Sequence, residues 1–187
     1  MNFLKKSVVV LLLVTALPLS FNSLSYLNFY PNYGFLKLKV TAIQTGWYLP
    51  FYYSHVLISA IILLVGIFQI NQNWRARWPE LHRFFGKIYV GGILFFAAPG
   101  GLVMSFFIMR GPWVLTSFLL QCSLWFLFTY KAYRHIRAGN ILQHQKWMFR
   151  SYALTLAAIT LRLYVFFSSW SFDLKQPEAY AIIAWLS

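Results

Sequence analysis

The chain has 187 residues, of which 60% are hydrophobic and 10% charged, and its mean hydropathy is +0.61. These values exclude a soluble globular domain and favour a protein that crosses a membrane several times. The formal net charge of +13 could indicate nucleic-acid binding, but the sixteen Lys and Arg residues lie mostly in short segments between apolar runs. Membrane topology explains that arrangement better, so we expect no nucleic-acid partner. The single cysteine, Cys122, lies within an apolar run and gives no disulfide framework.

The first apolar segment covers residues 7–28. It follows Lys5 and Lys6 as in a signal peptide, but no A-x-A-like cleavage site comes after it, so we predict an uncleaved first helix. Residues 28–46 contain Pro31 and two glycines and are predicted to form a loop.

Further helices are predicted from apolar runs and from the prolines and glycines that separate them, over residues 47–70, 79–109, 113–135, 141–170 and 177–187. Pro79 is a favourable first helical residue. The last segment is about 15 Å long as a helix, whereas a full span needs ~20 residues, so it is either incomplete or rests on a neighbouring helix. The sequence thus predicts an all-α fold, a polytopic transmembrane helix bundle of about six helices in a single integral membrane domain, residues 1–187.

Basic residues are divided unequally between the two predicted sides of the membrane. One side carries eleven of them and the other four. The first side is therefore predicted to be cytoplasmic, with a cytoplasmic N-terminus, in a bacterial inner (plasma) membrane whose lipid bilayer surrounds the chain. The eleven are Lys5, Lys6, Arg75, Arg77, Arg83, Lys87, Lys131, Arg134, Arg137, Lys146 and Arg150, and the four are Lys37, Lys39, Arg110 and Lys175.

Two series of polar and small residues recur at helical spacing, so each is predicted to occupy one face of a helix turned toward the bundle interior. The residues of the first series span about 27 Å of helix, nearly the thickness of the bilayer hydrocarbon, and end in an arginine. The first series is His144, Met148, Ser151, Thr155, Ile159 and Arg162, and the second is His55, Ser59, Ile62, Gly66, Gln69 and Asn73.

Small residues within these helices have a simpler explanation. Ser59 and Gly66 are typical of positions that let transmembrane helices approach closely and hydrogen-bond across the contact. Gly100 and Gly101, after Pro99, predict a kink or a close crossing in the third helix.

Three histidines are expected at one depth near the cytoplasmic side. His82 lies in the first turn of the third helix, His144 in the early turns of the fifth, and His135 at the end of the fourth. Neutral imidazole is the commonest metal ligand, so His82 and His144 are predicted to hold a metal or a haem between helices. The alternative is that these histidines lie among Lys and Arg in the wet headgroup zone and bind nothing.

Arg162 lies in an apolar span near its outer end, where burial costs ~2.5 to 3.5 kcal/mol if the charge is near the midplane. A structural pair with Asp173 would compensate it. The alternative is an acceptor from outside the chain, such as a haem propionate, a quinone carbonyl or a lipid phosphate. His55 is expected at a similar depth and could share that site.

Three segments resemble a family of predicted membrane proteins known as domain of unknown function 2306. They are YSHVLISAIILLVGIFQ (residues 53–69), LHRFFGKIYV (residues 81–90) and HQKWMFRSYALTLAAITLRLY (residues 144–164). The resemblance implies a membrane protein without an assigned reaction. It points to His55, His82, Arg83, His144, Trp147, Arg150 and Arg162.

The sequence lacks G-x-S-x-G, Walker, HExxH and GxGxxG motifs and has three carboxylates, so hydrolysis and nucleotide-driven chemistry are excluded. We predict a membrane redox module that binds haem b or a quinone. A non-enzymatic accessory subunit of a larger membrane complex, or a small-anion carrier, is the alternative, so enzymatic activity stays open. The predicted cofactor-binding residues are His55, His82, Arg83, His144, Arg150 and Arg162, with His82 and His144 as metal ligands.

Overall fold

The computed structural model describes residues 3–168 and 177–187, and this part of the chain is helical without β-strands, which confirms the predicted all-α bundle. Five of its segments are long and apolar enough to cross a membrane. The elements are α1 (Phe3–Leu24), η1 (Ser25–Asn28), η2 (Gly34–Leu38), α2 (Val40–Ile43), α3 (Tyr48–Ile70), α4 (Gln72–Arg77), α5 (Pro79–Gly92), η3 (Ile93–Ala97), α6 (Ala98–Phe106), α7 (Pro112–Arg137), α8 (Ile141–Ser168) and α9 (Pro177–Leu186).

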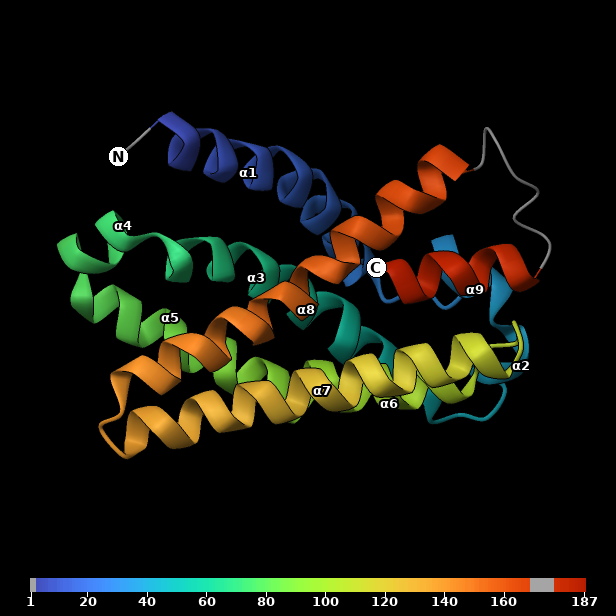
Figure 1. The fold of residues 1–187 in the computed structure, drawn as a ribbon. Helices are drawn as coiled ribbons and strands as arrows, with labels where there is room; N and C mark the ends of the chain where they lie inside the picture. Colours follow the sequence, from blue (N-terminus) through green and yellow to red (C-terminus); the bar gives the residue numbers. More distant parts are fainter. Residues whose placement is uncertain (1–2, 169–176) are drawn as a thin grey trace.

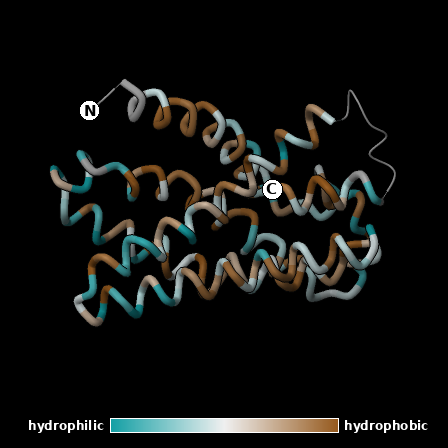
Figure 2. The backbone as a smooth tube through the Cα atoms, viewed as in Figure 1, coloured by the Kyte–Doolittle hydropathy of each residue, from teal (hydrophilic) through white to brown (hydrophobic). Residues whose placement is uncertain are grey.

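The long helices run back and forth between the two ends of the bundle (Figure 1). One end carries α4, the first turns of α5 and α8 and the last turns of α7. We name it the basic end, because most Lys and Arg residues lie there and hydrophilic residues gather at it (Figure 2). The opposite end carries η2, α2, the start of α3 and α9, and we name it the tyrosine-rich end after Tyr26, Tyr48, Tyr52, Tyr53 and Tyr180.

Local sequence explains where the helices begin and end. Pro79 and Pro112 occupy the first turns of α5 and α7, where a missing N–H costs no hydrogen bond. The side chain of Asn140 accepts a hydrogen bond from the backbone N–H of Gln143 at 3.1 Å and so caps the start of α8. The third span ends at Phe106, before the expected Met109. The end expected for the fifth helix, residue 170, lies outside the described residues.

The third span is not a uniform α-helix. Its middle, η3, is a π-helical turn between α5 and α6. Immediately after it, a Cβ atom on Gly100 would lie 2.6 Å from the backbone oxygen of Phe51, and one on Gly101 would lie 2.9 Å from the imidazole of His55. The predicted close crossing at these glycines is therefore confirmed, and it brings α6 onto α3.

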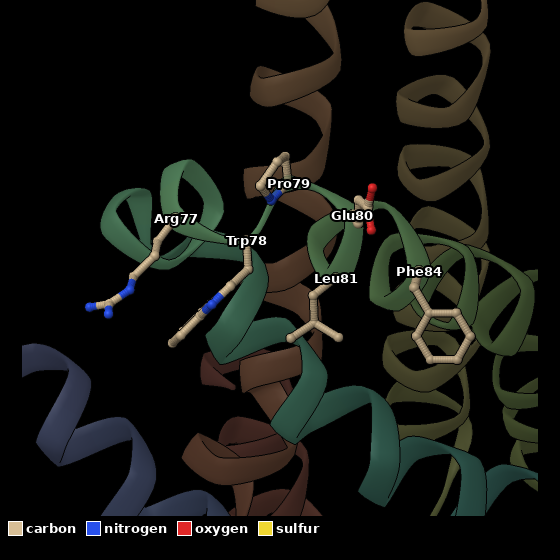
Figure 3. Close-up of a pocket in the computed structure, with 6 residues that line it drawn as sticks. All are labelled: Arg77, Trp78, Pro79, Glu80, Leu81 and Phe84. Carbon is tan, nitrogen blue, oxygen red and sulfur yellow. The ribbon is translucent and has the colours of Figure 1, made fainter.

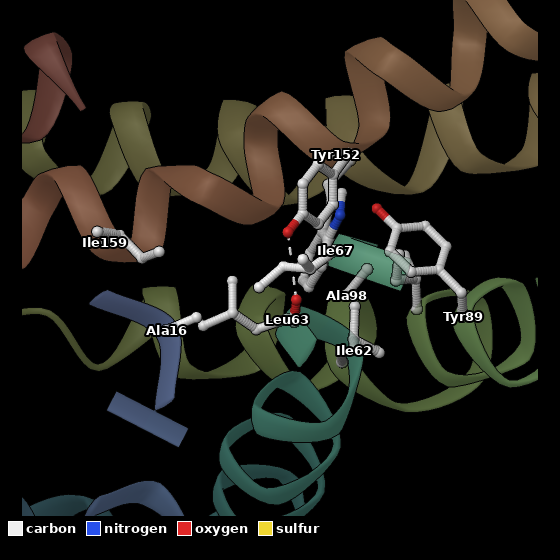
Figure 4. Close-up of a cluster of buried hydrophobic side chains, with 11 residues drawn as sticks. Ala16, Ile62, Leu63, Ile67, Tyr89, Ala98, Tyr152 and Ile159 are labelled. Atoms are coloured by element: carbon white, nitrogen blue, oxygen red, sulfur yellow. Dashed lines mark hydrogen bonds between the residues drawn. The ribbon is translucent and has the colours of Figure 1, made fainter. Parts of the chain in front are cut away.

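The centre of the bundle is where α3, α5 and α8 meet. Gly66 of α3 lies against the ring of Tyr152, which leaves no room for a Cβ atom, and the hydroxyl of Tyr152 donates to the Leu63 oxygen at 3.3 Å. Buried apolar side chains surround this crossing (Figure 4). The close approach predicted at Gly66 is confirmed. The hydrogen bond expected across the contact at Ser59 is wrong, because its buried hydroxyl oxygen has no partner.

The segment predicted to be a loop contains helical turns. Leu36 in η2 is fully buried and packs with Ala42, Tyr26, Tyr48 and Tyr52. This cluster closes the tyrosine-rich end. Apolar burial therefore orders a segment that its prolines and glycines marked as irregular.

Candidate functional site

Five buried polar side chains form a hydrogen-bonded cluster between α5, α7 and α8, which we name the hydroxyl cluster. The hydroxyl of Tyr89 lies 3.1 Å from Ser151 Oγ and 2.9 Å from Thr155 Oγ1. The indole N–H of Trp125 donates to Thr155 Oγ1 at 3.1 Å, and Thr129 Oγ1 lies 2.7 Å from Ser151 Oγ. All five side chains are buried.

Every proton of the hydroxyl cluster has an acceptor. Thr129 donates to the backbone oxygen of Trp125 at 2.7 Å, and Thr155 donates to that of Ser151 at 3.2 Å. Ser151 can then donate to Thr129, while Tyr89 donates to Ser151 or Thr155. A fully satisfied buried cluster fixes the packing of its helices and leaves no open group for a ligand.

The inward orientation predicted for Ser151 and Thr155 is confirmed. Sequence reasoning missed Trp125 and Thr129. The signal was present, because Cys122, Trp125, Thr129 and Ala132 recur at steps of three and four and are all buried along α7.

His144 lies near the basic end, at the start of α8, and is half-buried. Its Nδ1 is 2.9 Å from the backbone oxygen of Ala132 in α7. Since a carbonyl oxygen only accepts, Nδ1 carries the proton, and in the neutral ring Nε2 is an acceptor. The same bond fixes the orientation of the imidazole.

His82 lies in the first turn of α5 and is half-buried. Its backbone oxygen accepts a hydrogen bond from Gln69 Nε2 at 3.0 Å. Its Nδ1 is buried and has no hydrogen-bond partner. His82 lies within electrostatic range of His144 and of Arg75. We name His82 and His144 the histidine pair. His82 Nδ1 and His144 Nε2, on different helices, have no hydrogen-bond partner among the described residues, and whether the two imidazoles share a ligand stays a prediction.

The other predicted residues of the basic end are less constrained. Arg83 and Arg150 are exposed, and His135 is half-buried. The guanidinium of Arg150 lies 4.4 Å from the ring centre of Trp147. Among the residues that the structure describes, neither arginine hydrogen-bonds to the histidine pair.

His55 and Arg162 lie toward the tyrosine-rich end. His55 Nδ1 is 2.6 Å from the backbone oxygen of Ala97, the last residue of η3. His55 lies within electrostatic range of Arg162, as do Tyr52 and Tyr180.

Arg162 was expected to face the bundle interior, and its charge lies within electrostatic range of Tyr26, Tyr52 and Tyr180 of other elements. Arg162 is exposed, and its guanidinium donates to the Ala158 oxygen of its own helix at 2.9 Å. The last turns of α8 diverge from α7 (Figure 1). The alternative partner Asp173 lies outside the described residues.

A shallow recess lies at the α4–α5 turn, beside the first turn of α5 that carries His82. Figure 3 shows that its lining is mostly apolar or points outward, and it contains no histidine. Within the described ranges, no three His, Cys, Asp or Glu side chains gather as metal ligands. A metal at the histidine pair would therefore have two ligands of these types.

Comparison with protein families finds one match. The model of the predicted membrane protein family DUF2306 covers residues 52–187 and so includes α3 to α9, with His55, the histidine pair and Arg162. Comparison with curated proteins and with solved structures gives no match. Together with five apolar helices of spanning length, the family match shows that the chain is an integral membrane protein and that it belongs to the DUF2306 family of predicted membrane proteins.

Proposed function

We propose that this protein is a membrane redox module that binds the head group of a quinone at the histidine pair. The observation that carries the proposal is the unpartnered, buried Nδ1 of His82 within electrostatic range of His144, whose Nε2 is an acceptor, at one end of the bundle. A buried polar atom without a partner is costly, so a ligand that supplies one is favoured. The bilayer would deliver such an amphiphilic ligand.

Each imidazole has a distinct role in this proposal. Nδ1 of His82 can donate to a quinone carbonyl. Nε2 of His144 can accept a proton from a quinol hydroxyl, while its Nδ1–H remains on the Ala132 oxygen and stabilises the ring in the charged form. Oxidation of a quinol releases two protons and two electrons, and the electrons would pass to a redox centre of a partner subunit.

Space beside His82 supports the same assignment. Gly86 follows His82 by one turn on the same face of α5. A Cβ atom there would meet only the side-chain oxygen of Gln69, at 3.7 Å. A large side chain at this position would extend toward the proposed ligand.

Haem b fits the pair less well than a quinone does. Ligation by His144 through Nε2 would suit its Nδ1 bond to a backbone carbonyl. The buried free nitrogen of His82, however, is Nδ1, which stands next to the residue's own backbone and would crowd a porphyrin. Arg83 and Arg150, proposed for propionates or headgroups, are exposed and reach neither imidazole with a hydrogen bond.

Purification in a mild detergent tests the proposal. Extraction and chromatography should recover about one quinone per wild-type chain, and the same from His135→Ala, a control histidine at the same end. His144→Ala and His82→Leu should each retain about tenfold less, as expected for loss of one hydrogen bond at about 1.4 kcal/mol, and Gly86→Leu should also retain less because its side chain would occupy the proposed site. A Soret band that is present in the wild type and absent from His144→Ala would show that the ligand is haem b rather than a quinone. A wild type without quinone or haem would favour the accessory subunit or the anion carrier.

We also propose that the basic end faces the cytoplasm of a bacterial inner membrane, on the eleven-to-four division of basic residues. Arg110→Cys in a Cys122→Ser background should react with an impermeant thiol reagent from outside the cell. Arg77→Cys should react only after the membrane is opened. The reverse pattern would invert the orientation.

A further inference from the structure

Two cations from different helices share one aromatic ring near the basic end. Lys131 Nζ of α7 lies 4.5 Å from the ring centre of Trp147, and the guanidinium carbon of Arg150 lies 4.4 Å from the same centre. Phe128 packs against this indole at 5.4 Å between ring centres. The ring face attracts each cation and fixes its position. Because both cations lie within 4.5 Å of one ring centre, they are at most about 9 Å apart at the α7–α8 hairpin.

Two like charges within about 9 Å of each other repel, so an anion between or beside Lys131 and Arg150 would be favourable. In the part of the chain that the structure describes, no acidic side chain is paired with Lys131 or Arg150, and the acidic residue Glu80 lies on α5. The hairpin itself, from Pro112 to Ser168, contains no Asp or Glu. The described acidic residues therefore supply no counter-charge, and an anion from outside the protein would do so.

Depth and neighbours indicate its source. Lys131 and Trp147 each lie about 9 Å of helix from the α7–α8 turn, where we expect the boundary between headgroups and hydrocarbon. Leu127, one turn from Lys131 on α7, is exposed, and so is Phe149 on α8, next to Arg150. A molecule with a phosphate beside the two cations and an apolar chain along these side chains matches the surface.

We propose that Lys131, Trp147 and Arg150 form a binding site for the phosphate of an acidic phospholipid. Trp147 positions both cations, and the phosphate accepts charge-assisted hydrogen bonds from the ammonium and the guanidinium. The site is independent of the histidine pair, whose proposed ligand is an uncharged ring.

Thermal unfolding and native mass spectrometry of the purified full chain test this site with three probes: phosphatidylglycerol, phosphatidylcholine and inorganic phosphate. Phosphatidylglycerol should raise the unfolding midpoint and remain bound, whereas the other two should do neither. Lys131→Ala/Arg150→Ala should weaken phosphatidylglycerol binding about thirtyfold, and each single variant about fivefold.

Two control variants separate the site from general charge. Arg77 also lies at the basic end, with its guanidinium 5.3 Å from the ring centre of Trp78, but it is the single cation on that ring. The Arg77→Ala variant should therefore bind phosphatidylglycerol as the wild type does. Lys131→Arg/Arg150→Lys keeps both charges and should retain most of the affinity, which excludes a folding defect as the cause. Equal stabilisation by phosphatidylcholine, a response to inorganic phosphate alone, or full phosphatidylglycerol binding by the double alanine variant would overturn the proposal.

Discussion

The hydroxyl cluster and the histidine pair are both polar groups in a bundle that is otherwise apolar, but they differ in how completely they are satisfied. Tyr89, Ser151 and their neighbours use every proton they carry. Nδ1 of His82 is buried without a partner, and His144 uses one nitrogen. A polar cluster in which every hydrogen bond is made holds helices together. A cluster with unmade hydrogen bonds is where a bound ligand gains the most free energy.

The largest effect should come from the crossing beside the hydroxyl cluster. A Cβ atom on Gly66 overlaps the ring of Tyr152, so Gly66→Ala should destabilise the protein by about 3 kcal/mol. Gly91→Ala is the matched control, because nothing lies within 4 Å of its Cβ position, and it should be neutral or stabilise slightly. Unfolding in detergent measures both. Equal stability of the two variants would show that the centre of the bundle is loosely packed.

Tyr89→Phe should cost about 1 to 2 kcal/mol, because it removes the hydroxyl that joins Ser151 and Thr155. Tyr133→Phe, on the exposed surface of α7, should change stability by less than about 0.5 kcal/mol. Quinone content should be the same in both variants. A Tyr89→Phe protein that is stable but has lost its quinone would remove the distinction between a structural centre and a binding end.

The histidine pair should respond in the opposite way to removal of its members. His82→Leu removes a buried nitrogen without a partner and should leave the stability of the ligand-free protein unchanged or raise it. His144→Ala loses the bond to Ala132 and should cost about 1 kcal/mol. Both should reduce ligand binding. If His82→Leu is the more destabilising of the two, His82 has a structural role.

The smallest expected effect on stability concerns Lys39 at the tyrosine-rich end. Its ammonium is partly buried but has a hydrogen-bond partner. Burial and the nearby charge of Arg110 lower the pKa of Lys39 from 10.5, although its ammonium donates to the Phe107 oxygen at 2.7 Å. Between the lowered pKa and 10.5 the unfolded chain binds more protons than the folded one, so stability should rise with pH across that window. Lys39→Met should remove this part of the pH dependence. Identical pH profiles would contradict the assignment.

Much of the bundle could be predicted from the sequence, because proline and helical periodicity act locally. Pro79 begins α5, and the spacing of Ser151 and Thr155 places them inside. The hydrogen bond of Arg162 to the Ala158 oxygen of its own helix was not predicted from the sequence. The order of η2 was also missed, because the burial of Leu36 depends on tyrosines of other elements.

The histidines were identified from the sequence, but their hydrogen bonds were not. That His144 bonds to Ala132 and His55 to Ala97 depends on the packing of separate helices. The two cations on Trp147 likewise come from α7 and α8, and helical spacing alone relates only Trp147 and Arg150. Contacts between elements were therefore the part that required the structure.

The most direct test of the histidine pair is nitrogen NMR of protein labelled with ¹⁵N in its four histidines, titrated with a short-chain quinone and its quinol. Single substitutions assign the signals. The account predicts that Nδ1 of His82 and Nε2 of His144 shift together on titration, while His55 and His135 do not change. A shift confined to His55 or His135, or no shift at saturating quinone, would contradict it.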